Sequence, residues 1–333
     1  MNSMLKATSS LLCGPLRSSA FSAVKAIFNA ETRRYAEGRR ENKSVRLFIS
    51  AVLLSAGVIM FASQASAQTN APVAKEVLVF GQKIQYVETG SGPTVILLHG
   101  LGGSSQAWQL NIGALSQQYH VIVPDQIGFG KSDKPLVNYR IRTYVDFLDQ
   151  FCKQLKIERA SLVGNSMGGW IAALFTAAFP DRVDKLVLAD AGGYAPPKDF
   201  DTRLFYGLNP TTRDGMKVLV KKVFYNKIFH TDAAVDQAIA ARLAAGDGYT
   251  INSITESIIR GEDLLDEPVK TIERPTLIVW GREDGLIPLS DGERLNKDIA
   301  GSKLIVFDQC GHVPNIEKAM EFNTAVIKFL GEK

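Results

Sequence analysis

A pentapeptide of the type Gly-x-Ser-x-Gly is the first feature of this chain that could carry chemistry. It runs from Gly164 to Gly168 and places Ser166 at its centre. A short apolar run, 160–163, precedes it, and an alanine-rich run, 170–179, follows it. These runs predict a strand that turns sharply into a helix, and the two glycines allow backbone to pass close to backbone. The turn would raise the Ser166 hydroxyl above the sheet edge at a helix N-terminus, which suits a nucleophile.

A second segment could supply an oxyanion hole. Residues 94–98 form an apolar run typical of a buried strand, and a glycine-rich loop, 99–103, follows. Such a loop brings a backbone N–H toward the nucleophile. We therefore expect the N–H groups of Leu101 and Met167 to form the oxyanion hole. His99, directly after the strand, is expected to bond loop backbone rather than to move protons.

Adjacent carboxylates follow another predicted strand. The run 276–280 is rich in β-branched and aromatic residues, and Glu283 and Asp284 lie in the loop after it. A carboxylate beyond the C-terminal end of a strand can orient a catalytic histidine. Asp284, four residues before a proline, is the expected acid, and Glu283 fits a solvated turn better. Asp190, just after the predicted strand 185–189, is a third candidate.

Four histidines are available as the general base. His120 opens a predicted strand and is expected to be structural, and His230 lies in a helical stretch and is expected to be solvated. His312 alone follows the end of a predicted strand, 304–307, downstream of both the serine and the acid. This order of serine, acid and histidine predicts a catalytic triad with His312 as the base.

Together these motifs resemble the α/β-hydrolase superfamily over roughly residues 76–331. A further match is the segment 125–133 (DQIGFGKSD), which is similar to the family's D-x-x-G-x-G-x-S loop. The resemblance implies a serine hydrolase that forms an acyl-enzyme and needs no cofactor. No Cys/His spacing in the chain resembles a metal site.

The arrangement of apolar runs predicts the architecture. Strand runs alternate with helical segments, which indicates an α/β fold with a mainly parallel sheet covered by helices on both faces. A β-hairpin is expected at 76–87. At about 194–271 the alternation stops and helical patterns replace it, which looks like a cap that excludes water and sets substrate choice. Phe224 and Phe229 are expected either to line an apolar substrate pocket or to form the core of this cap.

The first functional hypothesis is a carboxylesterase or lipase that acts on a small ester with an apolar acyl group. The alternative is a C–C bond hydrolase similar to the meta-cleavage-product family, which has like Gly-Asn-Ser-Met-Gly-Gly and Cys-Gly-His segments. That family usually has a tryptophan after the histidine, where this chain has Val313, and an oxyanion loop richer in glycine and proline. A haloalkane dehalogenase is disfavoured because it needs a carboxylate in place of Ser166. A third hypothesis is that the chain is not an enzyme but a catalytically inactive protein of the same fold that binds a ligand.

The first 67 residues differ in character from the rest. A basic flank, the apolar run 47–61 and the sequence Ala65-Ser66-Ala67 are the three parts of a secretory signal. Cleavage is expected after Ala67, which makes 68–333 the hydrolase domain and the protein periplasmic or secreted. The apolar run has about fifteen residues, short of the roughly twenty of a spanning helix, and an uncleaved membrane anchor is the alternative.

The basic charge of the chain belongs to this leader. Of 38 basic and 34 acidic side chains, nine basic and three acidic ones lie in residues 1–67, so the domain has a slight acidic excess. The domain therefore gives no electrostatic case for nucleic-acid binding. Cys152 and Cys310 lie in the domain, and the sequence leaves open whether they pair.

Overall fold

The computed structural model describes residues 72–332, so the predicted signal and its cleavage site lie outside the described residues. Eight strands form one sheet in the order β1-β2-β4-β3-β5-β6-β7-β8. Only the pairs β1–β2 and β2–β4 are antiparallel, and all other neighbours are parallel. The strands are β1 (Val73–Val79), β2 (Gln82–Thr89), β3 (Thr94–Leu98), β4 (His120–Pro124), β5 (Ala160–Asn165), β6 (Val183–Ala189), β7 (Thr276–Gly281) and β8 (Lys303–Phe307). The predicted α/β fold with a mainly parallel sheet is confirmed.

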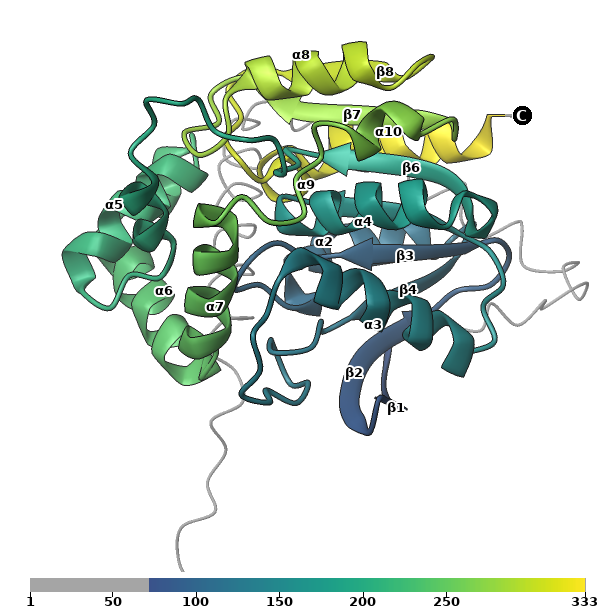
Figure 1. Ribbon diagram of the computed structural model, residues 1–333, viewed down its shortest axis with the longest axis horizontal. Helices are drawn as coiled ribbons and strands as arrows, with labels where there is room; N and C mark the ends of the chain where they lie inside the picture. The colour runs from purple at the N-terminus through teal and green to yellow at the C-terminus, as the bar shows by residue number, and fades with distance from the viewer. Residues whose placement is uncertain (1–71, 333) are drawn as a thin grey trace, which may run out of the picture. The chain divides into compact units, whose positions relative to one another are not determined.

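Helices cover both faces of this sheet (Figure 1). Ile96 and Leu98 of β3 pack into a core with α3 (Ile141–Gln154) and α4 (Met167–Ala178). Val95 and Leu97 pack into a second core with α2 (Gln109–Leu115) and α10 (Ala319–Gly331). Successive side chains of a strand point to opposite faces, so a strand covered on both sides must be apolar throughout. The helices outside the region between β6 and β7 are η1 (Ser105–Trp108), α2 (Gln109–Leu115), α3 (Ile141–Gln154), α4 (Met167–Ala178), η2 (Pro180–Arg182), α8 (Leu289–Asp298), α9 (Pro314–Glu317) and α10 (Ala319–Gly331).

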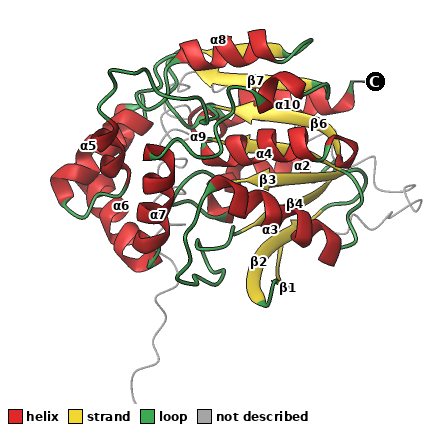
Figure 2. Ribbon diagram, viewed as in Figure 1, coloured by secondary structure: helices red, strands yellow, loops and turns green. Residues whose placement is uncertain are grey.

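A helical insert (residues 194–271) separates β6 from β7, where the sequence predicted that the alternation stops. Figures 1 and 2 show its helices α5, α6 and α7 beside the end of the sheet toward which the parallel strands point. Helices α5 and α6 share a small core of their own, whereas Ile251 and Ile254 of α7 pack into the main core. Its elements are η3 (Thr202–Leu208), α5 (Arg213–Val223), η4 (Lys227–His230), α6 (Asp232–Ala245), α7 (Gly248–Ile259) and η5 (Pro268–Thr271).

Within the described residues both cysteines are free and buried, which answers the question that the sequence left open. Burial raises the pKa of the Cys152 thiol to about 12, so this side chain stays protonated at neutral pH. Across residues 72–332, the helices are too short or too polar for any of them to cross a bilayer.

The turn between β5 and α4 depends on close backbone approach. A Cβ atom on Gly164 would lie 2.2 Å from the carbonyl oxygen of Gly168. A Cβ atom on Gly168 would lie 2.1 Å from the carbonyl oxygen of Leu98 in the neighbouring strand β3. Both contacts are with backbone, which cannot move aside without shifting the sheet, so only glycine fits at these two positions.

We therefore expect Gly168→Ala to destabilise the fold. Overpacking should lower the free energy of unfolding by about 1–3 kcal/mol, measured as a shift in the midpoint of urea unfolding. The control is Gly113→Ala in α2, where a Cβ atom would meet nothing within 4 Å. That change should leave stability equal or raise it, since alanine favours helix over glycine. Equal effects of the two variants would contradict the close-approach argument.

Candidate active site

Ser166 lies at the turn between β5 and α4 in a conformation that side chains rarely adopt. Its φ is 57° and its ψ is −121°. Its N–H donates to the carbonyl of Ala189 at the end of β6 (2.9 Å), and its carbonyl accepts from the N–H of Trp170 in α4 (3.1 Å). A non-glycine residue in this region costs of order 1–3 kcal/mol and persists only where its surroundings fix it. The neighbouring strand and helix thus hold the serine in the strained turn that a nucleophile elbow requires.

The loop after β3 lies against this serine. A Cβ atom on Gly100 would lie 3.1 Å from Ser166 Cβ and 3.5 Å from its Oγ. Among the described residues the N–H of Leu101 has no hydrogen-bond acceptor. Met167 is the first residue of α4, so its N–H precedes the bonds within the helix. Neither N–H group predicted for the oxyanion hole has an acceptor among the described residues, and their role stays a prediction.

His99 shapes the same loop. It is fully buried, its Nδ1 lies 2.8 Å from the Gly100 carbonyl, and its Nε2 accepts from the N–H of Gln126 (3.0 Å). Since Nε2 accepts, Nδ1 carries the proton and donates it to the carbonyl. Burial lowers the pKa of His99, which favours this neutral form. Both ring nitrogens are therefore used for backbone contacts, as the sequence predicted.

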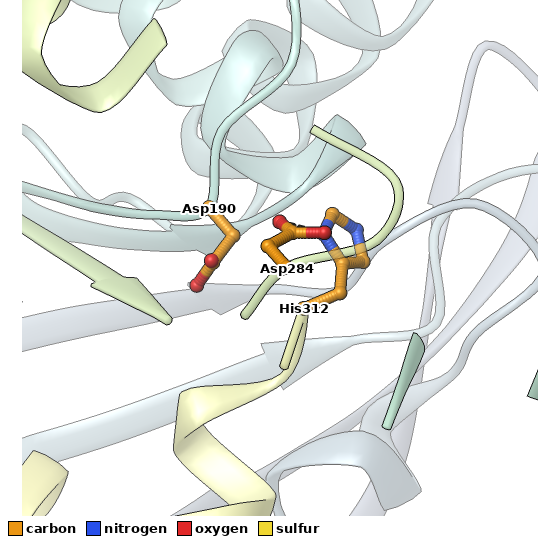
Figure 3. Close-up of side chains that lie close together, drawn as sticks. All are labelled: Asp190, Asp284 and His312. Atoms are coloured by element: carbon orange, nitrogen blue, oxygen red, sulfur yellow. Dashed lines mark hydrogen bonds and ion pairs between the residues drawn. The ribbon is translucent and has the colours of Figure 1, made fainter. Parts of the chain in front are cut away.

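Asp284 and His312 meet beyond the ends of β7 and β8 (Figure 3). Their Oδ2 and Nδ1 atoms lie 2.7 Å apart, and both side chains are almost inaccessible to solvent. The other carboxylate oxygen accepts from the N–H groups of Leu286 (2.7 Å) and Ile287 (3.0 Å), which fixes the carboxylate. Because Nδ1 donates to Asp284, Nε2 is the nitrogen that can accept a proton.

Glu283 has a different environment from the solvated turn that the sequence suggested. One of its carboxylate oxygens accepts from the N–H of Cys310 (2.9 Å), and its own N–H donates to the Cys310 carbonyl (3.0 Å). It therefore joins the loop of Asp284 to the loop of His312. This bracing role was missed because the two loops are far apart in the sequence.

Asp190 lies beside the same pair but is fully buried. One carboxyl oxygen accepts from the N–H of Gly281 (3.0 Å), and the other has no hydrogen-bond partner in the described structure. Burial, and then the nearby charge of Asp284, raise the pKa of Asp190 well above its usual range. The raised pKa favours the protonated form of Asp190, and Asp284 is the carboxyl group that faces His312 (Figure 3).

Donor atoms of Asp190, Asp284 and His312 lie within 4.8 Å of one another, a spacing that a metal ion could also use. Two of these three atoms already form the bond between His312 and Asp284. The cluster thus fits a hydrogen-bonded acid and base without further ligands.

The remaining two histidines have structural partners. His120 Nε2 lies 2.6 Å from a carboxylate oxygen of Glu88, which fits its predicted structural role. His230 Nε2 lies 2.8 Å from the carbonyl of Phe224. The prediction of a solvated His230 is therefore wrong, because this half-buried ring is hydrogen-bonded inside the insert.

Phe224 and Phe229 stack on each other with ring centroids 4.2 Å apart. They pack beside the core of the insert, which consists of Met216, Val220 and Val235. This arrangement favours the second of the two predicted roles, packing within the insert. A substrate contact by either ring stays a prediction.

Arg242 of α6 is a residue that the sequence analysis missed. Its Nη1 donates to both carboxylate oxygens of the buried Asp247 (2.9 and 3.0 Å), and its Nε has no partner among the described residues. A Cβ atom on Gly102 would lie 2.2 Å from its Nη2, so the guanidinium lies against the loop after β3. An arginine in an alanine-rich helix gives no sequence signal for such a position.

We expect Asp190→Asn to stabilise the protein more at high pH than at low pH. Because the pKa of Asp190 is raised on folding, the folded state keeps a proton that the unfolded chain releases above a pH of about 3.9. The wild type therefore loses stability as the pH rises above that value, and neutral asparagine does not. Melting temperatures at pH 4 and pH 8 measure this, with exposed Asp199→Asn as the control. A gain that is the same at both pH values would contradict a raised pKa.

Comparisons with known proteins identify hydrolases that this chain resembles in sequence and structure. The chain is 30% identical over 276 residues to the 2-hydroxymuconate semialdehyde hydrolase of Pseudomonas sp. (strain CF600), covering 80% of this chain and 97% of that protein. It is similar in structure to a meta-cleavage product hydrolase from Pseudomonas fluorescens IP01, with 34% identity, a TM-score of 0.71, and coverage of 77% and 97%. It is also similar to a membrane phospholipase A described as a bacterial virulence factor, with 27% identity, a TM-score of 0.69, and coverage of 93% and 97%.

The family match covers most of the chain. Residues 93–319 match the alpha/beta hydrolase fold family, and they include the strained serine, the buried acid and the histidine described above. The order of strands and the position of the insert fit the same conclusion. The chain therefore belongs to the alpha/beta hydrolase fold family.

Proposed function

We propose that the protein is a serine hydrolase that cleaves carboxylic esters, a carboxylesterase or lipase. The observation that carries this proposal is the arrangement around one sheet edge. Ser166 is held in a strained turn against Gly100, and His312 is held by Asp284 at 2.7 Å. A nucleophile and a base fixed by a buried acid are the parts that acyl transfer requires.

The proposed reaction has two halves. His312 Nε2 takes the proton of Ser166 Oγ while that oxygen attacks the ester carbonyl carbon. The N–H groups of Leu101 and Met167 bind the negative charge that develops on the carbonyl oxygen. His312 then gives its proton to the departing alcohol, which leaves an acyl-enzyme, and a water molecule releases the acid by the same steps. Asp284 holds the imidazole in one tautomer and stabilises its charged form.

The likeness to the membrane phospholipase A supports an ester substrate with an apolar acyl group. The same likeness supports the anchored alternative for the apolar run 47–61. Periplasmic or secreted location after cleavage at Ala67 stays the first proposal, and the domain is proposed to act on small molecules and not on nucleic acid.

A C–C bond hydrolase is the second candidate, and Arg242 favours it. The related hydrolases are named for semialdehydes and dienoates, and a dienoate carries a carboxylate. Arg242 places a buried guanidinium with an unused donor beside the loop after β3. Guanidinium groups suit carboxylate recognition because several donors lie in one plane.

Ser166→Ala and His312→Ala should each lower kcat by roughly 10⁴-fold or more, and the double variant should be little worse than either one. The residues act as one unit, so the losses do not add. Initial rates on p-nitrophenyl esters measure this, with His120→Ala, which bonds to Glu88, as a histidine control outside the triad. Losses that add in the logarithm of the rate would show that the two residues do not act in one step.

A substrate panel separates the two candidates. We expect the wild type to hydrolyse a ladder of p-nitrophenyl esters, with kcat/KM rising from acetate to octanoate by up to about 0.8 kcal/mol per buried methylene. A 2-hydroxy-6-oxo-dienoate tested beside them should be cleaved more slowly than the best ester. The reverse ranking would replace the ester proposal by the C–C hydrolase.

The role of Arg242 is tested in the same panel. Arg242→Gln combined with Asp247→Asn removes the guanidinium without leaving a lone buried charge, which would itself destabilise the fold. The double variant should lose dienoate turnover or binding and keep ester turnover if Arg242 recognises a carboxylate. Equal losses on both substrates would assign the pair a structural role.

A further inference from the structure

One short stretch of the insert is hydrogen-bonded to both loops of the acid–base pair. Gly285, the residue after Asp284, donates its N–H to the carbonyl of Lys222 (3.0 Å). His312 donates its own backbone N–H to the carbonyl of Val223 (2.7 Å). We name residues 222–226 the bridging segment. Because its carbonyls accept hydrogen bonds from both loops, the bridging segment contacts the loops that carry Asp284 and His312.

The Glu317 side chain also joins the histidine loop to the bridging segment. It is the last residue of α9, five positions after His312. One carboxylate oxygen accepts from the N–H of Gly311 (2.7 Å) and from that of Tyr225 (3.2 Å), and the other accepts from the N–H of Asn226 (2.7 Å). A single side chain thus joins the residue before the histidine to two residues of the bridging segment.

The chemistry of these contacts makes a carboxylate specific. Three N–H donors converge on two oxygens, and bonds to an ionised acceptor are roughly twice as strong as bonds between neutral groups. A glutamine of the same shape would replace one oxygen by an NH₂ group, which cannot accept. At least one backbone N–H would then face a donor, and the join between loop and insert would weaken.

We propose that Glu317 is a positioning residue, which orients His312 by tying the histidine loop to the bridging segment. The geometry between His312 and Asp284 then depends on the docked insert. The expected effect of Glu317 on turnover rests on the proposed hydrolase function. Its expected effect on the mobility of the histidine loop does not. The two can therefore be measured separately.

Glu317→Gln should lower kcat by roughly ten- to a hundredfold, because misplacement of a catalytic group by about 1 Å has effects of that size. The loss should be the same for acetate and octanoate p-nitrophenyl esters, with KM little changed, since the base serves both. Hydrogen exchange of the full chain should become faster in peptides covering residues 222–226 and 310–314. The control is Glu321→Gln on α10, an exposed glutamate without a hydrogen bond or ion pair in the described structure.

A second pair of variants tests the same join from the insert. Asn226 has φ −69°, which proline can adopt, and its side chain accepts from the N–H of Ile228 (3.1 Å). Asn226→Ala removes that side-chain contact only, whereas Asn226→Pro also removes the N–H that reaches Glu317. The proline variant should therefore show lower kcat and faster exchange at 310–314 than the alanine variant.

Three results would overturn the proposal. Unchanged exchange at 310–314 in Glu317→Gln would show that the carboxylate does not hold the loop. A loss confined to the octanoate ester would assign Glu317 to acyl binding through the insert. Faster exchange throughout the chain with a lower melting temperature would show a general structural role. If the wild type cleaves no ester, the ester proposal fails, and local exchange still decides whether Glu317 joins loop and insert.

Discussion

The site depends on one geometric constraint, the common edge at which the parallel strands end. The register pairs Leu98 with Gly164, Asn165 with Ala189, Ala189 with Val279, and Gly281 with Phe307, so each of β3, β5, β6, β7 and β8 ends within two residues of its neighbour. Parallel strands whose side chains are buried on both faces cannot slip without exposing apolar surface. The loops that follow these strands therefore lie close together. No direct contact between the site residues is needed to bring the loops there. This brings the loop after β3, Ser166, Asp284 and His312, which belong to four separate segments, to one edge of the sheet.

Local patterns in the sequence predicted where the strands of this edge end and which residues follow them. The strands β3, β7 and β8 are mainly apolar runs, and each site residue follows a strand end within a few positions, so the motifs around Ser166 and His312 could be placed from spacing. Contacts between distant segments gave no such signal. The bonds from Glu283 to Cys310 and from Glu317 to residues 225 and 226 join side chains to backbone N–H groups, which every residue except proline carries. No residue pattern marks an acceptor of that kind.

The choice among the three carboxylates shows what the sequence lacks. Asp190 and Asp284 both follow parallel strands, and their spacing from those strands is similar. Both side chains are buried, and their hydrogen-bond partners separate them: the Asp190 carboxyl has one N–H partner, whereas Asp284 has two N–H partners and the imidazole. Burial with a single donor raises the pKa of the Asp190 carboxyl, and only Asp284 bonds to His312. This difference follows from packing in three dimensions and is not encoded in local spacing.

The bonds between the insert and the site loops use main-chain carbonyls of residues 222 and 223. Main-chain groups are the same whatever side chain the residue carries, so this attachment places almost no demand on residue identity within the insert. Mutation can therefore reshape the side chains of the insert while the anchoring bonds persist. A duplicated gene could in this way acquire a new specificity through the insert and keep its acid–base geometry. Selection would then act on the backbone conformation of residues 222–226 rather than on their side chains.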